Sequence, residues 1–565
     1  MKIKFKYTYY VAFFILLIVS SCKHNNSESS FFRFNINSNL TTLDPAFAKD
    51  QGIGWCTSQL YNGLLQLDDS LQIQPCIAKN WEISRDDLTY TFYLRNDILF
   101  HQHAIFDGRK RYVTAHDVKY SLDRIIDKNV ASPGAWIFNE HVADSAFTVI
   151  NDSIFQIKLR HAFRPLLGIL TMSYCYIIPH EAIAYYGASF RKNPIGTGPF
   201  QFVAWKENEV LLMKRNPDYW EQDSIGHSLP YIEGLRVSFM DSKAAEFLEF
   251  SQGNLDFLNA IDPSYKDLIL DINGTIHPSF INKATLIRGN YLMTEYFGFM
   301  LDENAAYTPV QKMMNKKLLE FIKHKGIFLS KKKTFVKNEI LQNKKIRQAI
   351  NYAIDRESII AHFRNNIGIP AHGGMIPKGL AAYDTNYIKG YYYNPDKAIQ
   401  LLRESKYNKE PITLYTNPSY SEIGIYVIQL LRNIGFNAQL EILPPAFLRE
   451  MMAKRSCTFF RGAWIADYPD EESYMAMFYS KNGSPPNYTR FKNEEFDKLY
   501  KKVLNEHNDS IRIALYRKMD QIIIDEAAIV PLYYDNVIRF CNRRVTGLTI
   551  NPLNNLDLRK IKIEK

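Results

Sequence analysis

Three histidines in the first quarter of the chain have the residue type and spacing of metal ligands. His101 and His103 alternate, so an extended strand would place both imidazoles on one face, and His116 follows in the sequence. Neutral imidazole is a common protein ligand of zinc, copper and nickel. A transition-metal site is therefore the first chemistry to consider.

Catalytic motifs are the second chemistry to consider. The sequence has no GxSxG nucleophile turn, no HExxH zinc pair and no phosphate-binding P-loop. His180 begins the segment HEAIA, which lacks the second histidine of the zinc pair. We predict that the chain is not an enzyme, and a hydrolase that uses two of its many carboxylates stays open as an alternative.

The N-terminus has the pattern of a secretory signal. A basic start and a short apolar stretch, which ends at Val19, precede Ser20, Ser21 and Cys22. Small residues directly before a cysteine resemble the bacterial lipobox. We therefore predict a signal peptide over 1–21, a diacylglycerol anchor on the Cys22 thiol and a polar tether over 22–30. An uncleaved N-terminal anchor helix is the alternative, and either form places the chain outside the cytoplasm.

The remaining cysteines do not form a recognisable framework. They number five and contain no CxxC pair, so a zinc site has no local support and at least one thiol has no partner within the chain. We expect most of them to be buried free thiols: Cys56, Cys76, Cys175, Cys457 and Cys541.

Length and charge exclude several classes of protein. The 565 residues contain 46% hydrophobic and 23% charged residues, which is globular composition with room for several domains. The net charge is +10, and without Lys2, Lys4 and Lys6 it is 66 basic against 59 acidic residues, or +7. No basic stripe with interleaved aromatic residues occurs, so we expect no nucleic-acid partner.

The apolar pattern predicts helices and strands in alternation. Helical spacing predicts helices over 49–67, 114–126, 345–360, 396–405, 422–434, 494–504 and 511–525. Alternation predicts strands over 89–95, 438–443 and 529–535, and two strands within 200–214 around a turn at Glu207 and Asn208. A Lys-, Asn- and Met-rich stretch, 303–338, has the composition of a surface insertion with a helix over 310–323. This mixture indicates an α/β or α+β protein.

A series of motifs in a fixed order identifies a family. The N-terminal half contains LDPAFAKD (43–50), LYNGLLQLD (60–68), LFHQHAIFDG (99–108), VTAHDVKYSLDR (113–124), NPIGTGPF (193–200) and RNPDYW (215–220). The C-terminal half contains IRQAINYAIDRESII (346–360), WIADYPD (464–470) and AAIVPLYY (527–534). Together they resemble the extracytoplasmic solute-binding proteins of peptide ABC transporters, the dipeptide- and oligopeptide-binding family 5, over nearly the whole chain from about Leu43.

The resemblance implies an architecture. It is the two-lobed α/β fold of periplasmic binding proteins, type II and cluster C-like, with a hinge between the lobes and an extra subdomain on the first lobe. It places the first lobe at 31–68, 193–299 and 530–565, the extra subdomain at 69–192, and the second lobe at 300–529 with the insertion 303–338. The segment FHQH then occupies a position far from the cleft, so we expect His101 to serve the fold and predict no metal site.

The resemblance also implies which residues bind. In the family an aspartate of the ADY motif binds the α-ammonium of a peptide, and here the motif assigns that role to Asp467, with Tyr468 beside it. Trp464 matches an aromatic wall of a side-chain pocket, and Arg461 matches a basic position that meets the carboxylate of short peptides. From the residues alone, Asp467 as a turn cap before Pro469 and Arg461 as a surface residue stay open.

The implied function is capture of peptides with broad sequence specificity. The resemblance implies that a lipid-anchored monomer delivers them to a membrane permease, that separate subunits hydrolyse ATP, and that the chain needs no cofactor. Two alternatives stay open: a non-peptide solute, such as an oligosaccharide, a nickel complex or haem, and the hydrolase named above.

Overall fold

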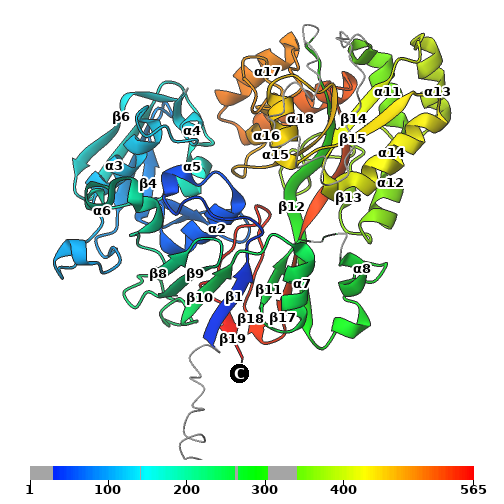
Figure 1. Cartoon of the computed structure of the whole chain (residues 1–565). Coiled ribbons are helices and arrows are strands. Elements are labelled where there is room, and N and C mark those ends of the chain that lie inside the picture. Colours follow the sequence, from blue (N-terminus) through cyan, green and yellow to red (C-terminus); the bar gives the residue numbers. More distant parts are fainter. Residues whose placement is uncertain (1–29, 140, 261, 263–264, 303–339, 565) are drawn as a thin grey trace, which may run out of the picture.

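The computed structural model describes residues 30–139, 141–260, 262, 265–302 and 340–564. The predicted signal peptide, Cys22 and the insertion 303–338 with its helix over 310–323 lie outside these residues. The described chain forms two lobes side by side, and long strands run from one into the other (Figure 1).

Two four-stranded sheets build most of the first lobe. One has the order β1-β10-β9-β8, in which β1 and β10 are parallel and the other neighbours antiparallel: β1 (Phe31–Asn35), β8 (Phe200–Lys206), β9 (Val210–Arg215) and β10 (Gly234–Ser238). The other is antiparallel with the order β4-β5-β7-β6: β4 (Ala78–Ile83), β5 (Thr89–Leu94), β6 (Val142–Asn151) and β7 (Ile154–Leu159). Two short pairs complete the strands here, β2 (Leu65–Leu67) with β3 (Ile73–Pro75) and β18 (Val545–Thr546) with β19 (Lys562–Ile563).

Helices of this lobe begin where the sequence offers caps. Asp50 accepts the Ile53 N–H at the start of α2 (Gln51–Leu60). Thr114 and Asp117 form a reciprocal capping box at α3 (Ala115–Ile126), which satisfies N–H groups that a helix start leaves unpaired. The other helices are α4 (Trp136–Asn139), α5 (Leu166–Ile169), α6 (His180–Tyr186), α7 (Lys243–Ser251) and α8 (Lys266–Ile269).

A seven-stranded sheet connects the lobes. Its order is β11-β17-β12-β16-β14-β15, with β13 also on β17: β11 (Phe257–Asn259), β12 (Ala284–Phe299), β13 (Ile369–Pro370), β14 (Ile412–Thr416), β15 (Ala438–Ile442), β16 (Phe459–Ile465) and β17 (Ile529–Asn542). β12 and β17 pair along most of their length, with register shifts between Asn290 and Tyr296. One end of this pair lies against β11 and the other against β16, so both strands belong to both lobes.

Helices cover both faces of this sheet in the second lobe (Figure 1). Successive residues of a strand point to opposite faces, so Leu414 and Phe459 enter one hydrophobic core and their neighbours Tyr415 and Phe460 enter the other. The helices are α11 (Lys344–Ala353), α12 (Arg356–Ser358), α13 (Pro395–Glu404), α14 (Ser421–Asn433), α15 (Pro445–Ala453), α16 (Glu472–Met475), α17 (Glu494–Leu504) and α18 (Asp509–Asp525).

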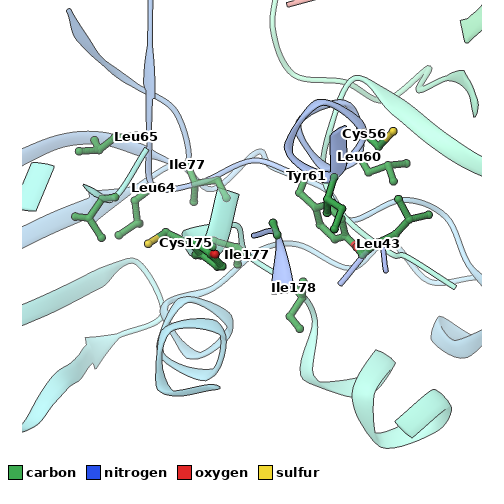
Figure 2. Packing of buried hydrophobic residues seen from close by; sticks show 14 of the residues in the cluster. Leu43, Cys56, Leu60, Tyr61, Leu64, Leu65, Ile77, Cys175, Ile177 and Ile178 are labelled. Carbon is green, nitrogen blue, oxygen red and sulfur yellow. The ribbon is translucent and has the colours of Figure 1, made fainter. Parts of the chain in front are cut away.

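The core of the first lobe contains three of the cysteines, Cys56, Cys175 and Cys541, of which Figure 2 labels the first two. Cys56 lies beside Leu60 and Tyr61, and Cys175 lies near Ile177. All five cysteines are buried free thiols, as predicted, and burial raises the pKa of each. Thiolate formation and disulfide exchange are therefore disfavoured.

Most predicted elements are confirmed within a residue or two. These are β5, α3, the β8–β9 hairpin, α13, α14, β15, α17 and α18. Two predicted helices are too long: 49–67 ends at Leu60 and continues into β2, and 345–360 breaks at Ile354 because Asp355 caps a new turn. The strand predicted over 529–535 continues to Asn542.

Every helix in the described part of the chain is too short or too polar to cross a lipid bilayer. The residue limits of the predicted lobes and extra subdomain stay a prediction.

Candidate functional site

A cavity of about 1540 Å³ lies between the lobes. The first lobe contributes α2 and the segment around Tyr174, the second lobe contributes the end of β16 and the turn after it, and the C-terminal segment around Arg559 closes another side. A volume of this size holds a ligand larger than most single metabolites.

The turn after β16 is held by neighbouring backbone and side chains. The Ala466 N–H donates to the Leu292 carbonyl at 2.9 Å, and the Asp467 N–H donates to Ser473 Oγ at 3.1 Å. Asp470 receives the Glu472 N–H at 2.9 Å and pairs with Arg512 at 2.8 Å. With its backbone tied on both sides, the turn presents the Asp467 side chain to the cavity.

Asp467 has a carboxylate without a cation beside it. Its side chain is exposed to the cavity, and no residue in the described ranges forms an ion pair with it. The surrounding walls remove bulk water from the carboxylate, which with the negative charge of Glu472 raises the pKa of Asp467 to about 7. An incoming ammonium group would supply the missing charge in a charge-assisted hydrogen bond.

The structure brings Trp464 and Tyr468 to the same cavity. The Trp464 indole N–H donates to Ser473 Oγ at 3.4 Å, which leaves the ring along the wall. Tyr468 is 3% exposed, donates its hydroxyl to Glu472, and packs against Gly168 of the first lobe, where an added Cβ would lie 3.3 Å from the Tyr468 Cβ.

Arg461 has a different environment and is not among the residues that line the cavity. Its guanidinium binds both oxygens of Glu295 on β12, with Nη2 to Oε2 at 2.6 Å, and lies 3.8 Å from the centre of the Tyr420 ring. Burial would lower the pKa of Arg461, but the Glu295 carboxylate raises it above its ordinary value. The predicted ligand carboxylate would thus have to share a guanidinium that already has a partner.

The histidines that could bind a metal serve other contacts. His101 is 5% exposed, its Nε2 lies 3.0 Å from the Gly198 carbonyl, and burial lowers its pKa to about 4. His103 instead accepts the Ile105 N–H and contacts the Tyr186 hydroxyl. Elsewhere, His180 lies near two carboxylates, Asp117 and Glu181, which both pair with Arg111. Arg111 therefore already occupies the carboxylate oxygens that a metal ion at this place would need.

Several residues of the cavity wall have no recognisable signal in the sequence. Glu472 is 4% exposed, and both its oxygens accept tyrosine hydroxyls, from Tyr468 and Tyr500. Its position in the run DYPDEE gave no sign that it, rather than Asp470 or Glu471, faces the cavity. Arg559 lies outside the motifs that indicated the family.

Two further histidines also line the cavity. His141 Nδ1 lies 3.2 Å from His161 Nε2, and the His141 ring stacks on Phe163 at 3.7 Å. Burial and the neighbouring His161 lower the pKa of His141 to about 4. The two histidines are 20 residues apart in the sequence, so no local spacing pattern relates them.

The comparisons with known proteins give the chain a family. The family model described as "Bacterial extracellular solute-binding proteins, family 5 Middle" matches residues 72–486. The chain belongs to this family. The family predicted from the motifs is therefore confirmed.

Curated relatives of this family 5 chain are similar along almost its whole length. The "Dipeptide-binding protein DppE" of Bacillus subtilis (strain 168) is 22% identical over 570 residues, which cover 95% of this chain and 92% of that one. The "Heme-binding protein A" of Haemophilus influenzae is 25% identical over 523 residues, which cover 88% and 85%.

Solved structures of the family confirm the two-lobed α/β fold. The periplasmic binding protein DppA of Helicobacter pylori, in complex with the peptide STSA, superposes with a TM-score of 0.75 at 22% identity. The match covers 95% of this chain and 99% of that one.

Proposed function

We propose that this family 5 protein is the substrate-binding component of an ABC importer and that it captures peptides in the cavity between its lobes. The observation that carries the proposal is the Asp467 carboxylate, which faces the cavity without a cation partner in the described ranges. A peptide supplies such a cation in its α-ammonium, whatever its sequence.

The other binding roles follow from the cavity wall. Trp464 forms one side of a side-chain pocket, and Tyr468 donates its hydroxyl to Glu472 and so fixes that carboxylate in the wall. We leave Arg461 out of the peptide contacts because Glu295 holds its guanidinium. The volume leaves room for water around ligand side chains, which favours broad specificity.

The protein would work from the outer face of a membrane. We propose cleavage after residue 21, a lipid anchor on Cys22 and a monomeric chain that delivers its peptide to a permease. Closure of the lobes around the ligand would be a population shift that contacts on both walls stabilise.

Release of the native ligand tests the proposal. The full chain is purified in detergent without refolding, then denatured, and the released molecules are sequenced by mass spectrometry. A ladder of peptides with mixed sequences is expected. Asp467→Asn should release far less peptide, while Asp144→Asn, which changes an exposed carboxylate outside the cavity wall, should release the same ladder. A single sugar or metal complex from the unchanged protein would refute the peptide assignment.

A second candidate solute is a metal complex or haem, which His141 and His161 favour. Their facing nitrogens, 3.2 Å apart, are suited to two neighbouring positions on one metal ion. Metal analysis and the absorption spectrum of the released material distinguish this solute from peptides.

A further inference from the structure

A second carboxylate lies beside Asp467 in the wall of the cavity. Glu472 starts α16, is 4% exposed and lines the cavity. Each of its oxygens accepts one tyrosine hydroxyl, from Tyr468 and from Tyr500. These donors are neutral, so they fix the position of the carboxylate without supplying a counter-charge, and burial raises the pKa of Glu472 above its ordinary value.

Neighbouring charges in the same region are neutralised by the protein, but these two are not. Arg512 pairs with Asp470, and Arg559 pairs with Asp557 and Glu221. In the described ranges neither Asp467 nor Glu472 has an ion-pair partner within 4.0 Å. A buried charge without a counter-charge is costly, so this end of the cavity is complete only when a ligand brings positive charge.

The cavity as a whole is acidic, although the chain has a net charge of +10. The single charge of Arg559 offsets only one of its two partners, Asp557 and Glu221, so among the described residues six carboxylate charges remain on the wall: those of Asp50, Asp68, Asp69, Asp467, Glu472 and one member of this pair. Three lysines face them: Lys49, Lys481 and Lys560. The local charge is therefore opposite in sign to that of the molecule, which favours cationic solutes.

Aromatic rings beside Glu472 suit a cationic side chain. Tyr479 and Tyr500 stack with centroids 4.5 Å apart, and both line the cavity together with Trp464. The face of an aromatic ring attracts ammonium and guanidinium groups, most strongly where water is excluded. Carboxylate and rings together make a subsite of the kind that binds lysine or arginine side chains.

We propose that Glu472, with Tyr479 and Tyr500, forms a subsite for a basic side chain next to the ammonium site at Asp467, so that the protein prefers peptides with lysine or arginine near the N-terminus. This inference rests on the proposed function. It narrows the solute from peptides in general to peptides with two positive charges at one end.

A matched peptide series tests the preference. Tripeptides and pentapeptides of alanine, each with lysine, alanine or glutamate at the first or second position, are titrated into ligand-free full chain in detergent by calorimetry. We expect the lysine peptides to bind about tenfold to a hundredfold more tightly than the alanine peptides, and the glutamate peptides more weakly still. Added salt should reduce the difference.

Two variants locate the effect. Glu472→Gln keeps the size of the side chain and should bring the affinities of lysine and alanine peptides within about threefold, while Asp144→Asn, which changes an exposed carboxylate outside the cavity wall, should leave the wild-type ratio. Equal affinity of the three wild-type series would overturn the inference even if Glu472→Gln failed to fold. If no peptide of either length binds, the proposed function fails first; if peptides bind without regard to charge, only the subsite fails.

Discussion

Two carboxylates near β16 differ in whether the protein itself supplies the opposite charge. Glu295 is fully buried and receives both its ionic bonds from Arg461, so the protein supplies both charges. Asp467, six residues after Arg461, faces the cavity and receives no cation from the described residues. A charge that the chain neutralises itself stabilises the fold, whereas one left open is available to a ligand.

The largest effect, on the free energy of unfolding, should come from breaking the buried ion pair between Arg461 and Glu295. Arg461→Met leaves the Glu295 carboxylate buried and unpaired, and we expect it to lower the free energy of unfolding by about 3–5 kcal/mol. Urea denaturation measures this loss. The double variant Glu295→Leu with Arg461→Met should recover most of the stability, because it removes both charges. If the double variant lost as much unfolding free energy as Arg461→Met or more, the conclusion that the ion pair neutralises Glu295 would be contradicted.

Removing the charge of Asp467 should weaken peptide binding and leave the stability of the fold unchanged. Asp467→Asn removes the charge that meets the ammonium group, and we expect peptide affinity to fall by about 2–4 kcal/mol, or thirtyfold to a thousandfold. The unfolding free energy at pH 7 should not fall, because no internal partner is lost. Calorimetric titration and urea denaturation of the same preparation check both, and a destabilised variant would assign Asp467 to the fold instead.

The two groups should also differ in their pH response. Cavity burial raises the pKa of Asp467 to about 7, above its ordinary 3.8, so binding an ammonium below pH 7 requires loss of a proton. We expect peptide affinity to rise between pH 5 and pH 8, by up to about tenfold per unit below pH 7. Asp467→Asn should bind weakly with no such slope, and an unchanged slope would indicate another titrating group.

The contribution of Asp467 to the free energy of unfolding should change with pH in the direction opposite to peptide affinity. A group whose pKa is raised on folding binds its proton more tightly in the folded state. Its contribution is therefore fully present below pH 3.8 and is lost as the pH rises through 7. The difference in unfolding free energy between the protein and Asp467→Asn, followed from pH 4 to pH 8, should show this trend.

The smallest effect concerns exposed pairs between the lobes. Arg164 binds Asp509 at 3.0 Å, and His507 binds Asp87 at 2.6 Å. Being exposed, each pair should contribute at most about 1 kcal/mol to the closed arrangement. Arg164→Glu and Asp509→Arg should each weaken peptide binding by a few fold at low salt, and the double charge swap should restore it. Loss without restoration would show that the pair does not link the lobes.

The sequence determined the local elements and the family. Cap residues and apolar spacing are local signals, so the start of α3 at Thr114 and the end of α14 before Gly435, which has φ of 106°, could be predicted from neighbouring residues. The ADY motif likewise located the turn that carries Asp467. The breaks at Tyr61 and Ile354 could not be predicted, because the apolar pattern continues across both.

Only the tertiary structure decided which charges are paired. Arg461 matches a binding position in sequence, but Glu295, 166 residues away, reaches it across neighbouring strands of the connecting sheet. Glu472 is one acidic residue among several in its run until Tyr500, 28 residues later, folds against it at the cavity wall. Pairing depends on distances between residues remote in the chain, and packing of the two lobes sets those distances.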